Sequence, residues 1–163
     1  MRHAKSSWAI PGARDFDREL NERGWSDLKK ISGVIREHAI LPELILCSSS
    51  QRTRQTLDGI KEAFSEEPEI KYLEEFYSGG MQDYIDTIKS VSGKKSIMTI
   101  GHNPMSGSLA NALATDGDEV ALQTIAQKYP TSAIAILEFD VSEWSDLEKS
   151  TGTLSDFIYP SKL

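Results

Sequence analysis

Short apolar runs alternate along this chain with longer stretches whose apolar residues recur at the spacing of an α-helix. The runs at residues 43–47, 95–100 and 131–139 predict buried strands, because each is short and rich in aliphatic residues. Residues 21–39 and 51–64 predict amphipathic helices. Strands that alternate with helices favour a layered α/β fold with a mostly parallel sheet, since each helix carries the chain back across the sheet.

Further segments complete the predicted order of elements. Residues 69–73 predict a weaker strand and residues 81–91 a helix, while the turn at residues 101–104 leads into a helix that ends near Leu113. We expect the tail, residues 144–160, to wrap the surface. Because the chain has 163 residues and no repeat or linker, we expect one domain over its full length.

Charge and composition exclude several classes of protein. The net charge of -7 argues against nucleic-acid binding, which depends on basic surfaces. The apolar stretches are far too short to span a bilayer, and no secretory signal is visible. The single cysteine, Cys47, cannot form an intrachain disulfide and fits a reducing compartment. We therefore expect a cytoplasmic protein without nucleic-acid or membrane partners.

Polar side chains follow two of the predicted strands. Arg52 and Arg54 come after the strand at residues 43–47, and His102 comes after the strand at residues 95–100. In a parallel sheet these loops meet at one edge, where helix N-termini add N–H donors that favour an anion. Arginine binds phosphate through a planar fork of N–H groups, so the pattern predicts a phosphate site that needs no metal.

Another arginine and another histidine, Arg2 and His3, stand side by side at the very start of the chain. Two histidines and two arginines in such settings suit an enzyme that transfers a phosphoryl group through a histidine. An active-site loop normally follows a buried strand, but here only Met1 precedes the pair. If the chain begins at Met1, we expect that strand to be absent and His3 to be loosely held.

The ordered motifs resemble those of a known family. The segment Arg2-His3-Ala4-Lys5-Ser6-Ser7-Trp8 resembles the arginine-histidine-glycine signature of the histidine phosphatase superfamily, with alanine in place of glycine. Residues 49–56 and 101–104 resemble its phosphate-binding and second-histidine segments. Three further segments point to the SixA-type phosphohistidine phosphatase branch; these are residues 15–24, 130–134 and 156–160.

The resemblance implies a fold and a domain. It implies a three-layer α/β sandwich of the phosphoglycerate mutase-like kind, in which helices flank a mostly parallel central sheet. It also implies a single histidine phosphatase domain over residues 1–163 and no cofactor.

The resemblance also implies roles for four residues. His3 would be the nucleophile, and it would be neutral at one ring nitrogen while the other donates to a backbone carbonyl. Arg2, Arg52 and His102 would bind the phosphoryl oxygens. His102 would in addition serve catalysis as a protonated imidazolium that its neighbours favour.

A general acid and a metal site are the remaining candidates. The family's acid is a carboxylate that follows a leucine, which implies Glu75, with Glu74 as the fallback or no acid at all. A zinc site formed by His3, His38 and His102 is not expected, since the three lack metal-ligand spacing.

Two functions remain open at this point. The first is a metal-independent phosphatase that forms a phosphohistidine intermediate and acts on protein phosphohistidine or on a small phosphorylated compound. The second is a catalytically impaired phosphate-binding or regulatory module of the same fold.

Overall fold

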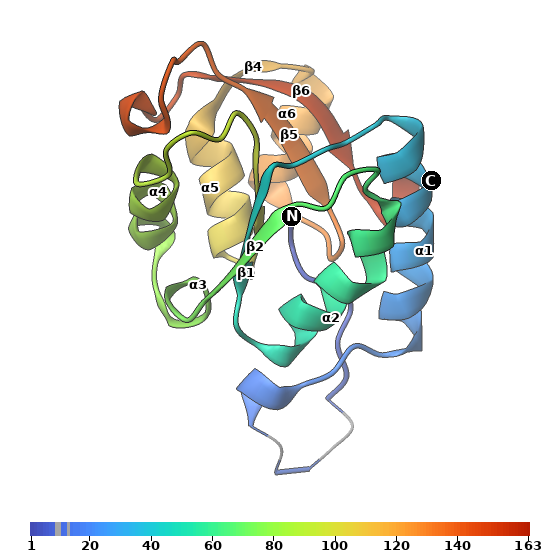
Figure 1. Cartoon of the computed structure of the whole chain (residues 1–163). Helices are drawn as coiled ribbons and strands as arrows, with labels where there is room; N and C mark the ends of the chain where they lie inside the picture. The colour runs from blue at the N-terminus through green and yellow to red at the C-terminus, as the bar shows by residue number, and fades with distance from the viewer. Residues whose placement is uncertain (9–10, 13) are drawn as a thin grey trace.

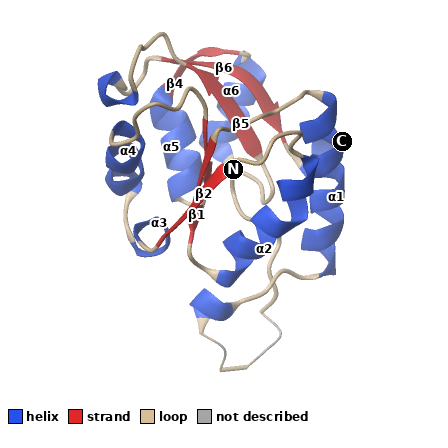
Figure 2. Ribbon diagram, viewed as in Figure 1, coloured by secondary structure: helices blue, strands red, loops and turns tan. Residues whose placement is uncertain are grey.

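Two three-stranded sheets with helices on their faces make up the fold in the computed structural model, which describes residues 1–8, 11–12 and 14–163 (Figure 1). The first sheet has the order β2-β1-β3 and is parallel. The second has the order β4-β6-β5, in which β6 runs parallel to β4 and antiparallel to β5 (Figure 2). The strands are β1 (Leu44–Ser48), β2 (Glu69–Leu73), β3 (Ile97–Ile100), β4 (Ala114–Gly117), β5 (Ile134–Glu138) and β6 (Gly152–Ile158).

Helices cover both faces of the first sheet. In Figure 1, α1 and α2 lie on one side of it, and α3, α4 and α5 lie on the other. The helices are α1 (Glu22–Glu37), α2 (Gln51–Ile60), α3 (Glu75–Ser78), α4 (Met81–Lys89), α5 (Met105–Leu113) and α6 (Glu119–Gln127). Short 3-10 helices are η1 (Asp15–Asp17), η2 (Lys61–Ala63), η3 (Trp144–Asp146) and η4 (Pro160–Lys162).

Strand β1 shows why the chain forms these layers. All five of its residues are buried. Side chains alternate between the two faces of a strand, so Ile45 and Cys47 join the core beneath α1 while Leu44 and Leu46 join the core beneath α4. A strand that is buried on both faces needs a continuous apolar run, which is the pattern that predicted it. The layered α/β class predicted from the sequence is confirmed.

The prediction for the tail is wrong. Residues 152–158 form β6, the central strand of the second sheet, and the side chain of Phe157 is only 1% exposed. The pairing of β5 with β6 shifts register between Ile136 and Leu137. A shift of this kind breaks the alternation of apolar and polar residues, so the sequence carries no clean strand signal there.

The first residues of the chain lie between the two sheets. The backbone N–H of His3 donates to the Gly101 carbonyl at the end of β3, and the N–H of Arg2 donates to the Ala133 carbonyl just before β5. Arg2 forms an isolated parallel bridge with Gly101 rather than a strand. Figure 1 marks the N-terminus near the middle of the molecule. The expected central sheet is therefore divided into two parts that residues 1–3 connect.

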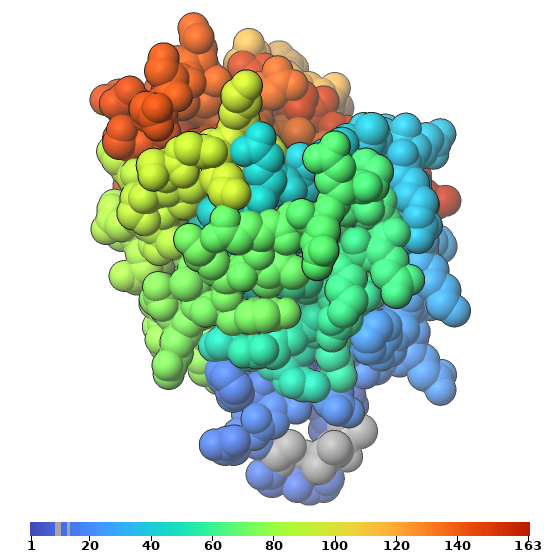
Figure 3. All heavy atoms as spheres, viewed as in Figure 1, coloured from blue at the N-terminus to red at the C-terminus, as the bar shows by residue number. Residues whose placement is uncertain are grey.

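The space-filling view shows which segments form one face of the molecule. In Figure 3, α2, β2 and the segment after β2 cover the middle of the visible face, and the blue N-terminal segment that contains η1 forms its lower end. None of the helices within the described residues is long and apolar enough to cross a membrane.

Candidate active site

His3 is buried and held by its backbone on two sides. Its N–H donates to the Gly101 carbonyl at 3.0 Å, and its carbonyl accepts from the Ser132 N–H at 3.2 Å. The next residue, Ala4, donates its N–H to the Thr56 hydroxyl of α2 at 2.9 Å. The expectation that His3 would be loosely held is therefore wrong, because hydrogen bonds to three neighbouring segments hold residues 3 and 4 in place.

The ring of His3 has a defined tautomer. Its Nδ1 lies 2.7 Å from the Ala4 carbonyl oxygen, which can only accept, so Nδ1 carries the proton and Nε2 keeps a free lone pair. Burial lowers the pKa of His3 to about 3, and the charges of His102, Arg52 and Arg2 act in the same direction. The imidazole is therefore neutral at neutral pH. This is the form expected of a nucleophile.

His102 lies beside His3, with the ring centroids 5.2 Å apart. Its Nε2 is 2.8 Å from the hydroxyl of Ser48 at the end of β1. The loops that follow β1 and β3 therefore converge, as the order of the strands predicted. The adjacent Gly101 has to be glycine, because a Cβ there would collide with the hydroxyl of Tyr84.

The protonation state of His102 differs from the expectation. Burial lowers its pKa to about 4, and the nearby guanidinium of Arg52 lowers it further. In the protein alone His102 is thus neutral at neutral pH, and the expected preference for imidazolium is wrong. An anion in contact with the ring would favour the charged form and raise the pKa of His102.

Two arginines lie close enough to the two histidines for their charges to act on both rings. Arg52 is 6% exposed at the start of α2, and its Nη1 and Nη2 donate to the main-chain carbonyl and the carboxylate of Asp15 at 2.6 and 2.9 Å. Arg2 donates from Nη1 to the Tyr129 carbonyl at 2.7 Å. Three ring or guanidinium nitrogens are buried without a partner among the described residues; they are Arg2 Nε, Arg52 Nε and His102 Nδ1. Buried polar atoms of this kind are costly unless a ligand satisfies them.

Asp15 is the site residue that sequence reasoning missed. Its carboxylate accepts from Arg52, from Arg18 at 2.8 Å and from the Tyr77 hydroxyl at 3.2 Å. Desolvation alone would raise the pKa of Asp15, but the hydrogen bonds from Arg18 and Arg52 and the charge of Arg52 hold it at about 2. The only available signal was its place in the segment at residues 15–24 that resembles the SixA-type branch.

The structure does not bring the predicted acid to the site. Glu75 is exposed at the first position of α3, and Glu74 before it is exposed as well. Within the described residues neither carboxylate forms a hydrogen bond or an ion pair with His3, Arg52 or His102. Their neighbour Tyr77 does contact the site, since its ring packs edge-on against His102 at a centroid distance of 5.7 Å.

The third histidine lies elsewhere. His38 caps the C-terminus of α1, and its Nδ1 is 3.6 Å from a carboxylate oxygen of Asp156. Across residues 1–8, 11–12 and 14–163, no group of three or more histidine, cysteine, aspartate or glutamate side chains is placed to hold a metal ion.

Comparison with known proteins identifies the family. A family model described as the histidine phosphatase superfamily (branch 1) matches residues 1–93, a range that includes His3, Arg52 and Asp15. The chain belongs to the histidine phosphatase superfamily. It is accordingly a phosphatase, which is a hydrolase.

Several relatives of this histidine phosphatase support that placement. An uncharacterised protein of Mycobacterium tuberculosis is 33% identical over 165 residues, which cover 98% of this chain and 99% of that protein. The structure of the Agrobacterium tumefaciens protein assigned as phosphohistidine phosphatase SixA is 33% identical, covers 98% of this chain and 95% of that chain, and superposes with a TM-score of 0.82. The SixA-type resemblance is therefore confirmed.

A more distant structure shows the fold alone. The Escherichia coli protein assigned as an alpha-ribazole-5'-P phosphatase is 11% identical, with a TM-score of 0.65 over 96% of this chain and 94% of that chain. Together with the Agrobacterium structure it confirms the phosphoglycerate mutase-like α/β class.

Removing Asp15 should weaken this phosphatase through Arg52. We expect Asp15→Ala to lower kcat/KM roughly tenfold, because the carboxylate that orients the buried guanidinium is lost. Asp17→Ala is the matched control, since Asp17 pairs with the exposed Arg14 at 2.7 Å and not with Arg52. Steady-state kinetics of both variants measures the effect. Equal activities for the two variants would show that Asp15 does not position Arg52.

Stability should fall as the pH drops below 6.5. The folded-state pKa values of His3 and His102, about 3 and about 4, lie below their usual 6.5, so the unfolded chain binds more protons in that window. Their contribution is complete above pH 6.5 and decreases as the pH falls towards the folded-state values. We expect the two histidines together to lower the free energy of unfolding by on the order of 3 kcal/mol between pH 7 and pH 5. The Met1 amino group, whose pKa burial lowers from 8.0 to about 5, adds to this decrease.

Urea unfolding at a series of pH values measures this dependence. His102→Asn should remove about half of the contribution of the two histidines, and His38→Asn, at the half-exposed end of α1, is the matched control. An unaltered pH dependence in His102→Asn would contradict the assignment.

Proposed function

We propose that this protein is a metal-independent phosphatase that forms a phosphohistidine on His3 and acts on phosphohistidine in proteins. The observation that carries the proposal is the free lone pair on His3 Nε2, next to Arg2, Arg52 and His102 with their unpartnered buried nitrogens. The substrate class is supported by the Agrobacterium protein assigned as SixA, which matches nearly the whole chain. A small phosphorylated compound is the other substrate that this site could accept.

The first step transfers the phosphoryl group to His3. The Nε2 lone pair attacks phosphorus, the bond from phosphorus to the leaving nitrogen or oxygen breaks, and the bonding electrons depart with the leaving group. The Ala4 carbonyl holds the Nδ1 proton throughout, so the ring can carry the positive charge that develops as the new bond forms. Water then attacks the phosphohistidine, releases inorganic phosphate and restores neutral His3.

Charge on the phosphoryl oxygens is balanced by the surrounding cations. Arg52 and Arg2 offer guanidinium N–H donors, and His102 can become an imidazolium once an anion offsets its burial. These donors can neutralise a phosphoryl group in transfer, which is the task that a metal ion performs elsewhere. The metal independence of the proposal rests on this complement of donors.

The leaving group determines whether an acid is needed. A phosphorylated imidazole can take up its own proton from water, whereas an alkyl phosphate releases a poor leaving group that needs an acid. Glu75 is exposed and out of contact with His3, so we assign it no step. This difference favours phosphohistidine over small alkyl phosphates as the substrate.

The experiment measures turnover of p-nitrophenyl phosphate and of a phosphohistidine-containing protein in the presence of EDTA. We expect hydrolysis of both, with the higher kcat/KM for the phosphoprotein. A requirement for added metal would refute the mechanism. Phosphate binding without any turnover would favour the impaired module instead.

A further inference from the structure

Tyr77 of α3 connects the buried phosphate site with the surface of the protein. Its ring is tilted by 76° from that of His102, with the centroids 5.7 Å apart, and the guanidinium carbon of Arg52 lies 5.9 Å from the centre of the same ring. His102 and Arg52 are only 9% and 6% exposed, whereas Tyr77 is partly exposed. An aromatic ring therefore lies on the solvent side of two groups that we propose to bind phosphate.

The ring of Tyr77 is held in place by a second segment, η1. Phe16 packs edge-on against it, with the centroids 4.9 Å apart. The Tyr77 hydroxyl donates to a carboxylate oxygen of Asp15 at 3.2 Å, and the same oxygen accepts from Arg52 at 2.9 Å. An aromatic side chain that is already fixed loses little conformational entropy when another ring packs against it.

The buried position of His3 indicates where the leaving group lies. In phosphoryl transfer the attacking and leaving atoms lie roughly in line, on opposite sides of phosphorus. His3 is only 8% exposed, so its Nε2 approaches phosphorus from the interior and the leaving group points towards solvent. The leaving group therefore meets the partly exposed residues at the edge of the site, which include the aromatic rings of Tyr77 and Phe16.

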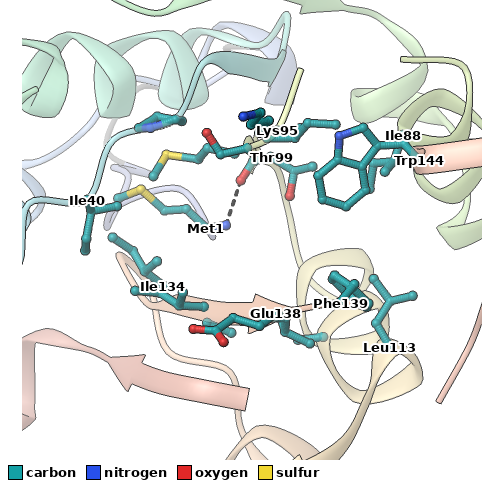
Figure 4. Close-up of a pocket in the computed structure, with 18 of the residues that line it drawn as sticks. Met1, Ile40, Ile88, Lys95, Thr99, Leu113, Ile134, Glu138, Phe139 and Trp144 are labelled. Carbon is teal, nitrogen blue, oxygen red and sulfur yellow. Dashed lines mark hydrogen bonds between the residues drawn. The ribbon is translucent and has the colours of Figure 1, made fainter. Parts of the chain in front are cut away.

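A cavity of about 760 Å³ between the two sheets is separate from this edge. Figure 4 shows Met1, Ile134 and Trp144 among the side chains that line it. The described residues of its lining do not include the members of the phosphate site and its edge, namely His3, Arg52, His102 and Tyr77. It is therefore not the space that a leaving group next to His3 would occupy.

We propose that Tyr77 determines leaving-group specificity by packing its ring against the imidazole of a substrate phosphohistidine. This inference rests on the phosphatase activity proposed above and names the residue that selects among its substrates. Aromatic rings attract each other in edge-to-face and offset arrangements, and imidazole is a planar aromatic ring. Phosphoramidate has the same type of P–N bond but no ring, so it gains nothing from Tyr77.

The contact with the imidazole exists before the P–N bond breaks as well as during the reaction. Interactions that are equal in the bound substrate and in the transition state lower KM and leave kcat unchanged. Loss of the Tyr77 ring should therefore raise KM for phosphohistidine and affect kcat little.

The test measures kcat and KM of the full chain with a phosphohistidine peptide and with phosphoramidate. We expect Tyr77→Leu to lower the ratio of the two kcat/KM values roughly threefold to tenfold, through KM for the peptide. Tyr77→Phe keeps the ring and removes only the hydroxyl, so it should restore the ratio to within about twofold of the unchanged protein. Because Tyr77 is partly exposed, we expect the leucine variant to fold.

Tyr72→Leu is the matched control. Tyr72 is 42% exposed in β2, and its ring lies beneath the guanidinium of Arg54 at 4.0 Å. The same substitution there should leave the ratio of the two kcat/KM values within about twofold.

Two results would overturn the proposal and leave the phosphatase function standing. One is an unaltered ratio in Tyr77→Leu, even if both activities fall, because Tyr77 would then support the site without contacting the leaving group. The other is an equal loss of the ratio in Tyr77→Phe, since the hydroxyl bonded to Asp15 would then be responsible. If the unchanged protein hydrolyses neither substrate, the proposed function itself is refuted, and the inference with it.

Discussion

His3→Ala should abolish turnover, with kcat reduced by about 10⁴-fold or more. The variant has no group that can form the covalent intermediate, because the neighbouring His102 directs Nε2 to the Ser48 hydroxyl and its Nδ1 is buried. The measurement is steady-state hydrolysis of p-nitrophenyl phosphate, together with trapping of an acid-labile, base-stable phosphoenzyme after rapid quenching. Both the turnover and the trapped phosphoenzyme should disappear together.

His38→Ala is the matched control for this variant. His38 is half exposed at the C-terminus of α1, and its Nδ1 lies 3.6 Å from a carboxylate oxygen of Asp156. We expect it to retain activity within about twofold. A phosphoenzyme that persists in His3→Ala would remove His3 from the mechanism, even if activity were low.

Arg52→Lys should lower kcat by about 10²- to 10³-fold although the positive charge is kept. The guanidinium of Arg52 uses Nη1 and Nη2 to hold Asp15 and leaves Nε buried without a partner. Lysine offers one ammonium in place of this planar fork, so it cannot hold Asp15 and a phosphoryl oxygen in the same geometry. Kinetics with saturating substrate separates the effect on kcat from the effect on KM.

Arg54→Lys provides the comparison on the same helix. Arg54 donates from Nε to the Ser49 carbonyl at 2.8 Å and lies over the ring of Tyr72, so it does not face His3. We expect activity within about threefold of the unchanged protein. Equal losses in Arg52→Lys and Arg54→Lys would mean that α2 is disturbed as a whole and that Arg52 has no special role.

Local patterns in the sequence predicted much of the fold. The predictions of a strand at Leu44–Ser48 and of a helix at Glu22–Glu37 are confirmed, because the apolar pattern of each segment matches the period of its element. The strands of the second sheet were harder to predict from the sequence. Strand β6 pairs with β5 through a register shift, and β4 has exposed or half-buried residues, so neither shows a clean alternation of apolar and polar side chains.

Some residues of the candidate site were predicted from the sequence and others were not. His3, Arg2, Arg52 and His102 were found from short motifs, and the structure brings all four together. Glu75 was placed by its position after Leu73, but the backbone turns into α3 there and leaves its side chain exposed. The carboxylate that does reach the site comes by a long-range contact, from Asp15 in η1 to Arg52, which is 37 residues away.

By itself the sequence of this protein predicted the strands and long helices of the first sheet, the family and four side chains proposed to bind phosphate. Those properties depend on residue types and on spacing within a few positions. Only the tertiary structure decided that His102 has a lowered pKa and that Asp15 is the partner of Arg52. These depend on burial and on contacts between distant segments, because desolvation and hydrogen bonding act through space and not along the chain. The Arg2-His3 pair illustrates both contributions. Its motif can be recognised from two adjacent residues, whereas the hydrogen bonds that hold residues 3 and 4 come from the distant residues Gly101, Ser132 and Thr56.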